Sequence, residues 1–305
     1  MKAVTVDATG EAPRVTDMPE PKVGPDTVLV RVKAAGVNPV DWKVAAGRLD
    51  PVMYLYFPLI PGWDAAGVVE RVGAAVTDYA PGDEVIAYDR TDTVQHGTYA
   101  ELVPVPVRAV ARKPASLTWA QAGGLPLAGL TALQSLQAAD VTKGDIVLVN
   151  NAAGGVGTFA VQIAVAAGAH VIGTASEAKA DFLRSLGAEH VAYGEGLVQR
   201  VRDLAPEGVD ASLDFYGGEA TSASLEVTKS PSRVVSIADP AIREKGGVYV
   251  FARPDHSGLT KLGDLADAGK LTVHVERELP LADVAEAWRL SQEGHVTGKI
   301  VLQVS

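Results

Sequence analysis

The first 115 or so residues alternate between short apolar, β-branched runs and clusters of turn residues. The runs read KAVTV, TVLVRV, AGVVERVG, DEVIAY and YAELVPV, and stretches such as VGPD and APGDE separate them. Short runs bounded by Gly, Pro and Asp are typical of strands joined by tight turns. This pattern predicts a small, barrel-like antiparallel domain.

A second pattern begins near residue 118 and continues to about residue 266. The apolar runs DIVLVN, HVIGT, EHVAY, VDASLDF and SRVVSIA predict strands, and GVGTFAVQIAVAAG and EAKADFLRSLG predict helices between them. Strands that alternate with helices are typical of βαβ units with right-handed crossovers. We therefore expect a parallel sheet in this part of the chain.

The tail of the chain returns to the first pattern. It predicts a strand, an amphipathic helix and a final strand, with the helix's apolar positions at Leu281, Val284, Ala285, Ala287, Trp288 and Leu290. We therefore expect the parallel-sheet domain to be inserted into the other. The predicted domains are residues 1–117 with 268–305, and residues 118–267.

A glycine-rich stretch, NNAAGGVG over residues 150–157, separates the strand DIVLV from an apolar helix. The free backbone N–H groups and the dipole at a helix N-terminus attract a pyrophosphate. Glycines lack the Cβ atoms that would keep phosphates and the neighbouring strand at a distance. Because the stretch lies between a strand and a helix in a βαβ pattern, it predicts dinucleotide binding. A tight strand-to-helix turn without a ligand is the alternative.

The residues after the next predicted strand indicate which dinucleotide binds. A site selective for NAD usually places Asp or Glu there, against the ribose 2′-hydroxyl. This chain has Gly173-Thr174-Ala175-Ser176 instead, followed by Lys179. A hydroxyl and a cation favour the 2′-phosphate of NADPH, although Glu177 weakens the electrostatic argument and Lys179 is alternatively an exposed helix lysine.

Composition excludes several classes of protein and site. The chain has 305 residues, of which 47% are hydrophobic, and a formal net charge of -10 with scattered Lys and Arg, which opposes nucleic-acid binding. It has no cysteine, so disulfides and thiolate zinc sites are excluded. No apolar segment reaches the roughly 18 residues of a membrane span, and MKAVTVDATG lacks the apolar run of a secretory signal. We expect a cytoplasmic protein without a membrane partner.

Several segments resemble, in order, the zinc-independent quinone oxidoreductases, the zeta-crystallin-like group of the medium-chain dehydrogenase/reductase superfamily. They are AAGVNPVDWKVAAG, FPLIPGWDAAGVVERVG, GDEVIAY, HGTYAEL, GLPLAGLTALQSL, NAAGGVG, VIGTAS, LGAEHVAY and TGKIVL. The resemblance implies an α/β protein with a GroES-like antiparallel β-barrel catalytic domain and an inserted Rossmann-type, doubly wound parallel sheet. It also implies a homodimer that uses NADPH to reduce quinones or other activated alkenes.

Compared with zinc-containing relatives, this chain has lost both metal positions. Asn38 replaces a catalytic Cys, and Trp63 and Asp64 replace a His-Glu pair. We therefore expect no metal. Hydride addition to a simple ketone normally needs a Lewis acid or a positioned proton donor to stabilise the alkoxide. A quinone or α,β-unsaturated carbonyl spreads the charge over its own conjugated system, so it is the expected substrate.

The resemblance and the pattern together give candidate site residues. Asn38, Tyr54, Tyr56 and Trp63 are the candidates for catalysis or the substrate pocket; Asn38 is alternatively a turn residue before Pro39, and the tyrosines are alternatively packed against Trp42 and Phe57. The candidate cofactor-binding residues are Asn38, Thr131, Asn151, Ala153, Gly154, Gly155, Val156, Gly157, Thr174, Ser176, Lys179, Tyr193, Ile237, Phe251, Arg253 and Lys299. For Lys299 a solvated strand position is the alternative.

Two other functions stay open at this point. The segment IADPAIREKGGVYVFARPDHSG resembles the branch that reduces alkenals, enones or biosynthetic enoyl intermediates. The chain is therefore alternatively an enoyl reductase dedicated to one intermediate. A non-catalytic NADPH-binding protein is the third possibility, because Trp42 and Trp63 lie near the expected substrate pocket.

Overall fold

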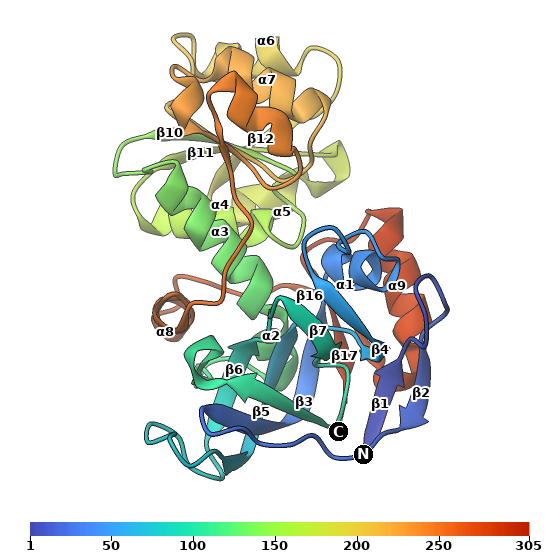
Figure 1. Ribbon diagram of the computed structural model, residues 1–305. Coiled ribbons are helices and arrows are strands. Elements are labelled where there is room, and N and C mark those ends of the chain that lie inside the picture. The colour runs from blue at the N-terminus through green and yellow to red at the C-terminus, as the bar shows by residue number, and fades with distance from the viewer. Residues whose placement is uncertain (305) are drawn as a thin grey trace. The chain divides into compact units, whose positions relative to one another are not determined.

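The structure is a computed structural model that describes residues 1–304. The chain divides into two compact units, one formed by Met1–Leu130, Arg253–Gly269 and Val273–Ser305, the other by Thr131–Ala252 and Lys270–Thr272. The second unit is thus inserted into the first, and Figure 1 follows the chain through both.

The first unit is built on a seven-stranded sheet of order β16-β17-β3-β5-β6-β9, with β8 also paired to β3. All neighbours in it are antiparallel except β16 and β17, which run parallel. Its strands are β3 (Thr27–Val37), β5 (Asp64–Val72), β6 (Glu84–Tyr88), β8 (Leu102–Pro106), β9 (Val110–Arg112), β16 (Val275–Pro280) and β17 (Lys299–Gln303). Two-stranded sheets join β1 (Lys2–Thr5) to β2 (Arg14–Asp17), and β4 (Tyr54–Ile60) to β7 (Thr93–His96).

The tail completes this first unit. Strand β17 pairs antiparallel with β3, with Ile300 opposite Val37. Helix α9 (Val284–Glu293) buries Trp288 in the same apolar core as residues of β3 such as Val30. Each fully buried side chain of this kind contributes about 1.5–3 kcal/mol, so this packing holds the C-terminal segment to the first unit.

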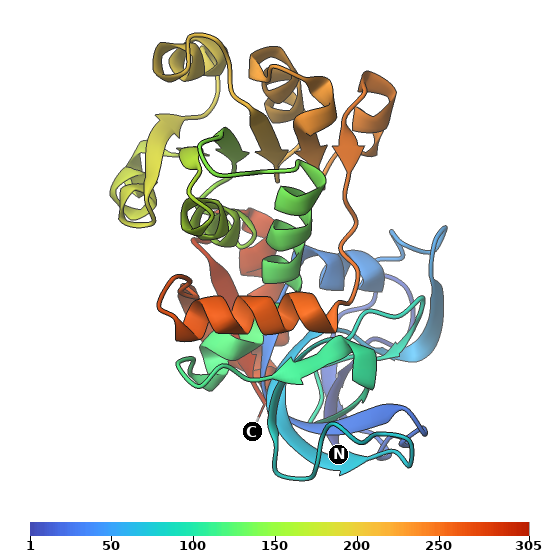
Figure 2. The ribbon, with the colours of Figure 1, turned by 90° about the vertical axis from the view of Figure 1, so that its left-hand side faces the viewer.

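The division between the units differs from the predicted boundary at residue 267. Helix α8 (His256–Asp267) belongs to the first unit (Figure 2, orange-red). The carboxylate of Asp267 accepts hydrogen bonds from the backbone N–H groups of Ala115 and Ser116 at 3.3 and 2.8 Å. Gly263 packs so closely that a Cβ there would lie 3.2 Å from Cγ of Pro114. These partners lie some 150 residues away in sequence, so periodicity alone does not reveal them.

The segment after residue 117 also belongs largely to the first unit. Helix α2 (Trp119–Gly124) packs on β3, where a Cβ on Gly123 would lie 2.9 Å from the carbonyl oxygen of Ala34. Helix α3 (Pro126–Ala138) passes from the first unit into the second at Leu130. The remaining helix of the first unit is α1 (Pro39–Ala45), and its short 3-10 helices are η1 (Val107–Ala109) and η5 (Leu281–Asp283).

The second unit is a six-stranded parallel sheet of order β12-β11-β10-β13-β14-β15. Its strands are β10 (Ile146–Asn150), β11 (His170–Ala175), β12 (Ala188–Ala192), β13 (Ala211–Asp214), β14 (Val234–Ser236) and β15 (Val248–Tyr249). Its helices are α4 (Gly157–Ala166), α5 (Ala180–Ser185), α6 (Leu197–Leu204) and α7 (Glu219–Val227), with 3-10 helices η2 (Glu177–Lys179), η3 (Pro231–Arg233) and η4 (Pro240–Lys245).

The strand order places a topological switch point between β10 and β13. The chain proceeds from β10 through β11 to β12 on one side, and from β13 to β15 on the other. In such sheets ligands bind at the carboxyl ends of the strands beside the switch point. The expected parallel sheet, inserted into a largely antiparallel first unit, is thus confirmed.

Candidate functional site

The glycine-rich loop connects the end of β10, at Asn150, to the start of α4, at Gly157. Asn151 adopts a φ of +56°, and its carbonyl oxygen lies where a Cβ on Gly157 would meet it at only 2.1 Å. The Asn151 amide lies over Gly154, whose added Cβ would be 2.8 Å from Nδ2. Only glycine fits position 157 in this compact turn, and the loop brings backbone rather than side chains to the helix N-terminus.

Buried hydrogen bonds from neighbouring elements fix the glycine-rich loop at its start. Thr174 accepts a hydrogen bond from the Asn151 N–H at 3.1 Å and donates its own to Oδ1 of Asn150 at 3.3 Å. Asn150 Nδ2 donates to Ser224 Oγ at 2.8 Å. Thr174 is 2% exposed, so the structure places this predicted cofactor residue beneath the loop, where it supports Asn151.

Two predicted residues of the adenosine side follow neighbouring strands. Ala175 and Ala192 are paired at the carboxyl ends of β11 and β12, so Ser176 and Tyr193 emerge side by side at that edge. Tyr193 is 64% exposed. Lys179 ends the short helix η2, which begins at Glu177. No carboxylate terminates β11, and the residues present fit a 2′-phosphorylated dinucleotide.

Glu177 is an acidic residue close to this edge of the sheet. Its Oε2 lies 3.9 Å from Nδ1 of His190, and Nε2 of His190 lies 3.1 Å from the carbonyl oxygen of Ala175. The Glu177 side chain is 80% exposed. It therefore extends into solvent beside a histidine, and does not occupy the end of β11.

The other predicted cofactor residues lie in different settings. Ile237 and Phe251 follow β14 and β15 at the same carboxyl edge as the glycine loop, and Phe251 is 42% exposed. Thr131 is buried inside α3, with 4% exposure. Arg253 is the first residue of the segment that returns to the first unit. Ile237 and Phe251 thus lie at the carboxyl edge of the parallel sheet because they follow its strands. Thr131 and Arg253 do not follow a strand of this sheet.

Asp214, at the end of β13, is a structural residue that the sequence analysis missed. Its Oδ1 accepts from the N–H groups of Tyr216 and Gly217 at 3.0 and 2.9 Å. Its Oδ2 accepts from the hydroxyl groups of Thr221 and Ser236 at 2.5 and 2.9 Å. The carboxylate therefore orders the turn beside the switch point and leaves Tyr216 75% exposed there. The available signal was an aspartate at a strand end, three residues before Gly217-Gly218.

In the first unit, Asn38 lies in a buried polar cluster with Asp64 and Lys299. Asn38 Nδ2 donates to Oδ2 of Asp64 at 2.8 Å, and its Oδ1 accepts from Lys299 Nζ at 2.5 Å. Lys299 also donates to the carbonyl oxygen of Val37 at 3.1 Å, and lies 3.8 Å from Asp64 Oδ2. Asn38 and Lys299 are only 2% and 3% exposed. Lys299 is therefore not the solvated strand residue that the sequence left open.

Asp41 extends this cluster from the first turn of α1. Its Oδ2 accepts from the Asn38 N–H at 2.8 Å and from the Tyr99 hydroxyl at 2.7 Å, whereas its Oδ1 has no hydrogen-bond partner. Burial raises the pKa of Asp41 to about 7, although both hydrogen bonds and Lys299 oppose the rise. Burial likewise raises the pKa of Asp64 to about 6, against the charge of Lys299. Both carboxyl groups thus titrate near neutral pH.

The aromatic candidates of the first unit divide into one buried and two exposed side chains. Trp63 is 3% exposed and packs edge-to-face against Tyr88, with ring centroids 6.2 Å apart. Tyr54 and Tyr56 are 72% and 53% exposed on β4. Neither tyrosine is therefore part of the buried core, and the face of β4 that carries both is open to solvent.

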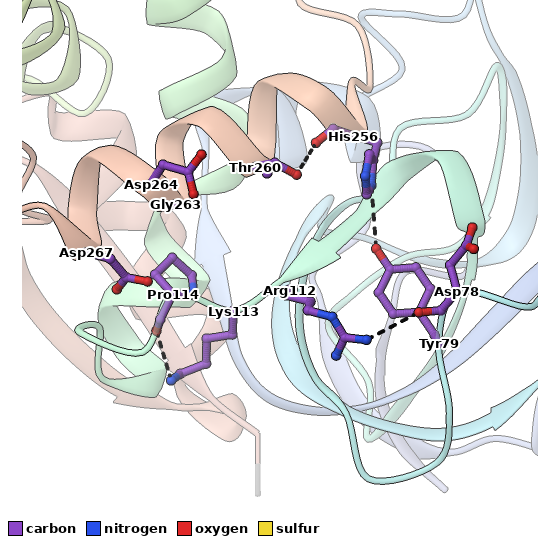
Figure 3. A pocket seen from close by; sticks show the side chains of 10 residues that line it. All are labelled: Asp78, Tyr79, Arg112, Lys113, Pro114, His256, Thr260, Gly263, Asp264 and Asp267. Atoms are coloured by element: carbon purple, nitrogen blue, oxygen red, sulfur yellow. Dashed lines mark hydrogen bonds between the residues drawn. The ribbon is translucent and has the colours of Figure 1, made fainter.

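A cavity of about 390 Å³ lies between β9, the loop before β6 and helix α8 (Figure 3). Tyr79 and His256 both approach the carbonyl oxygen of Val110, at 2.9 and 2.6 Å. Arg112 and Lys113 are paired with Asp83 and Glu84. Because these groups serve internal contacts and none is a predicted site residue, the cavity is not the candidate active site.

Two further observations concern metals and membranes. Within residues 1–304, no three His, Cys, Asp or Glu side chains gather into a set suited to a metal ion. Over the same residues, no helix combines the length and apolarity that crossing a bilayer requires.

Comparison with known families and proteins gives consistent matches. Residues 24–115 match the alcohol dehydrogenase GroES-like domain, and residues 186–302 match the family described as zinc-binding dehydrogenase. The chloroplast envelope quinone oxidoreductase homolog of Arabidopsis thaliana is 31% identical over 94% of this chain and 92% of the relative. The chloroplastic NADPH-dependent alkenal/one oxidoreductase of the same plant is 35% identical over 92% of this chain and 73% of the relative. The solved structure of the quinone oxidoreductase from Coxiella burnetii has a TM-score of 0.87 and 31% identity, and the match covers 100% of this chain and 99% of that one.

Proposed function

We propose that this chain, which belongs to the quinone oxidoreductase group of the medium-chain dehydrogenase/reductase superfamily, reduces quinones or other activated alkenes with NADPH. The similarity to an NADPH-dependent alkenal/one oxidoreductase supports both the cofactor and enones or enals as substrates. The glycine loop supports binding of a dinucleotide, and the absence of a carboxylate at the end of β11 supports NADPH over NADH.

The observation that carries this proposal is the engagement of the Asn38 amide. Asn38 replaces a metal-binding cysteine of zinc-containing relatives, and its nitrogen and oxygen are bound by Asp64 and Lys299. Such a side chain is committed to the interior of the protein. We infer a metal-free reaction, for which a conjugated acceptor is suited because it spreads the arriving negative charge over its own π system.

In this reaction bound NADPH supplies the hydride. The protein's part is to hold the dinucleotide at the glycine loop, through Asn151, Ala153, Gly154, Gly155, Val156 and Gly157. On the first unit, we assign Tyr54 and Tyr56 to substrate contact because they are exposed, and Asn38 and Trp63 to the buried support of the pocket. The other residues of the proposed cofactor set are Asn38, Thr131, Thr174, Ser176, Lys179, Tyr193, Ile237, Phe251, Arg253 and Lys299.

The first experiment follows NADPH absorbance with EDTA-treated protein. The panel contains 1,4-benzoquinone, 9,10-phenanthrenequinone, an enal, an enone and a simple ketone, with NADH in parallel. We expect turnover of quinones or enones but not of the ketone, and a preference for NADPH. Tight NADPH binding without turnover of any of these compounds would contradict broad quinone or enone reduction. A dedicated enoyl reductase or a non-catalytic role would then be favoured.

We also propose that the protein is a cytoplasmic homodimer. The resemblance supports the dimer, and the composition supports the location. Light scattering coupled to gel filtration tests the first, since a dimer has twice the 31.7 kDa mass of the chain. Cell fractionation tests the second, and recovery with a membrane or organelle fraction would contradict it.

A further inference from the structure

A single arginine of helix α6 organises the loop that follows β12. Arg200 Nε and Nη2 donate to the carbonyl oxygen of Ala192 at 3.1 and 2.9 Å, and Nη1 donates to that of Glu195 at 2.9 Å. Nη2 also lies 3.4 Å from the carbonyl oxygens of Tyr193 and Gly194. One planar guanidinium thus binds four consecutive carbonyl groups.

The conformation of this loop depends on the arginine. Gly194 and Gly196 have φ of +90° and +76°, in the left-handed region that favours glycine. A Cβ on Gly196 would lie 3.0 Å from Arg200 Nη1, so the chain wraps closely around the guanidinium. Four carbonyl oxygens turned toward one point repel one another unless a cation lies there, and the fork of Arg presents several N–H groups in one plane.

The loop carries one of the residues expected beside the adenosine phosphate. Tyr193 is 64% exposed, and the residue before it pairs with Ala175, the residue before Ser176. The sheet register thus brings Tyr193 beside Ser176, and the loop that begins at Tyr193 is the one whose carbonyl groups Arg200 binds. In the described residues, the hydrogen bonds of Arg200 all go to backbone carbonyl oxygens, so no carboxylate neutralises its charge.

We propose that Arg200 is a positioning residue for recognition of the 2′-phosphate of NADPH. It turns the negative ends of four peptide dipoles inward, away from an incoming phosphate, and fixes Tyr193 at the edge of the site. Its positive charge adds to that of Lys179 at this edge. The proposal deepens the NADPH-dependent function proposed above and rests on it.

The test compares two fragments of the cofactor that differ only in the 2′-phosphate. Binding of 2′,5′-ADP and of 5′-AMP is measured by calorimetry for the unmodified protein, R200Q and R200K. The matched control is R202Q, because Arg202 lies on the same helix and, within residues 1–304, its polar contacts are with Glu226 at the surface. Circular dichroism and the thermal midpoint establish that each variant is folded.

We expect R200Q to weaken 2′,5′-ADP binding about tenfold or more, because the edge loses a positive charge and the loop loses the group that binds its carbonyl oxygens. Binding of 5′-AMP, which lacks the 2′-phosphate, should weaken by less than about twofold. R200K keeps the positive charge but lacks the planar guanidinium, so its affinity for 2′,5′-ADP should fall by an intermediate amount. If R200Q does not fold, the comparison of R200K with the unmodified protein is the test. R202Q should bind both fragments normally. KM for NADPH should rise in R200Q with little change in kcat.

Two results overturn the proposal in distinguishable ways. If the Arg200 variants weaken both fragments equally, or neither, Arg200 has no part in 2′-phosphate recognition, whereas NADPH use by the unmodified protein stands. If the unmodified protein binds 5′-AMP but not 2′,5′-ADP, the NADPH-dependent function itself fails, and the role of Arg200 fails with it.

Discussion

The ammonium of Lys299 lies 2.5 Å from Oδ1 of Asn38, and both side chains are buried. The two residues are 261 positions apart in sequence and meet because β17 pairs with β3, which ends at Val37. Asp64 contributes the opposite charge from β5. The position at which the sequence resemblance implied a lost metal ligand is thus part of an internal network of amide, carboxylate and ammonium.

Replacement of Lys299 by methionine tests the strength of this network. Met has a similar length but leaves Asp64 and Asp41 without a cation, and breaking a buried pair in this way costs about 3–5 kcal/mol. We expect the free energy of unfolding in urea to fall by about that amount. The control is K22M, because Lys22 is exposed, and its change should stay within about 0.5 kcal/mol. If K299M also changed the free energy of unfolding by no more than about 0.5 kcal/mol, the network would be energetically neutral.

The raised pKa values of Asp41 and Asp64 predict a dependence of stability on pH. Burial raises them from the ordinary value of 3.8 to about 7 and about 6. Between the ordinary pKa of 3.8 and the raised values, the folded protein binds more protons than the unfolded chain, so the free energy of unfolding falls as pH rises. The contribution is fully present below about pH 4 and is lost as pH rises through about 7.

The variant D41N isolates this effect. An amide oxygen still accepts from Asn38 N–H and Tyr99, but the group no longer titrates. Urea unfolding from pH 5 to pH 8 should show a smaller decrease of stability in D41N than in the unmodified protein. Other carboxylates, such as Asp145 and Asp210 with lowered pKa values, act in both proteins alike. Identical slopes for the two proteins would mean that Asp41 is ionised throughout this range.

The elements of the molecule were largely predictable from sequence, because they depend on local periodicity and turn residues. The strands that end at Asn150 and Ala175, and the glycine loop between β10 and α4, lie where the pattern placed them. The tail returns to the first unit for the same reason, since its apolar helix had no place in an alternating βαβ pattern.

Contacts between residues far apart in sequence were not predictable. Nothing in the local pattern around Lys299 indicates that it binds Asn38. Helix α8 belongs to the first unit through contacts such as the hydrogen bond from the Ser116 N–H to Asp267, which periodicity does not reveal. Arg200 likewise resembles any polar residue of an amphipathic helix until the carbonyl groups after β12 are seen around it. Side-chain partners across a fold are set by tertiary packing, which a single sequence leaves open.

At position 151, we expect substitution by glycine to destabilise the protein less than substitution by alanine. Its φ of +56° is in the left-handed region, where Asn is accepted and Gly is unstrained, but a Cβ without a hydrogen-bonding side chain costs roughly 1 kcal/mol. N151A should therefore unfold at a lower temperature than N151G. The measurement is thermal unfolding followed by circular dichroism. Equal midpoints for the two variants would show that the backbone at position 151 relaxes out of this conformation.

Adding a single methyl group at Gly157 should weaken the proposed cofactor site. A Cβ there would lie 2.1 Å from the carbonyl oxygen of Asn151 and 2.6 Å from Cα of Ala152, and both are backbone atoms that move only with the loop. G157A should displace the turn from the helix N-terminus and weaken NADPH binding about tenfold or more, because the N–H groups no longer converge on the phosphates. The control is A166S, an exposed substitution near the end of the same helix. Fluorescence titration with NADPH measures both variants. Unchanged affinity in a folded G157A protein would mean that the dinucleotide does not use this turn, and would remove the structural basis for the proposed function.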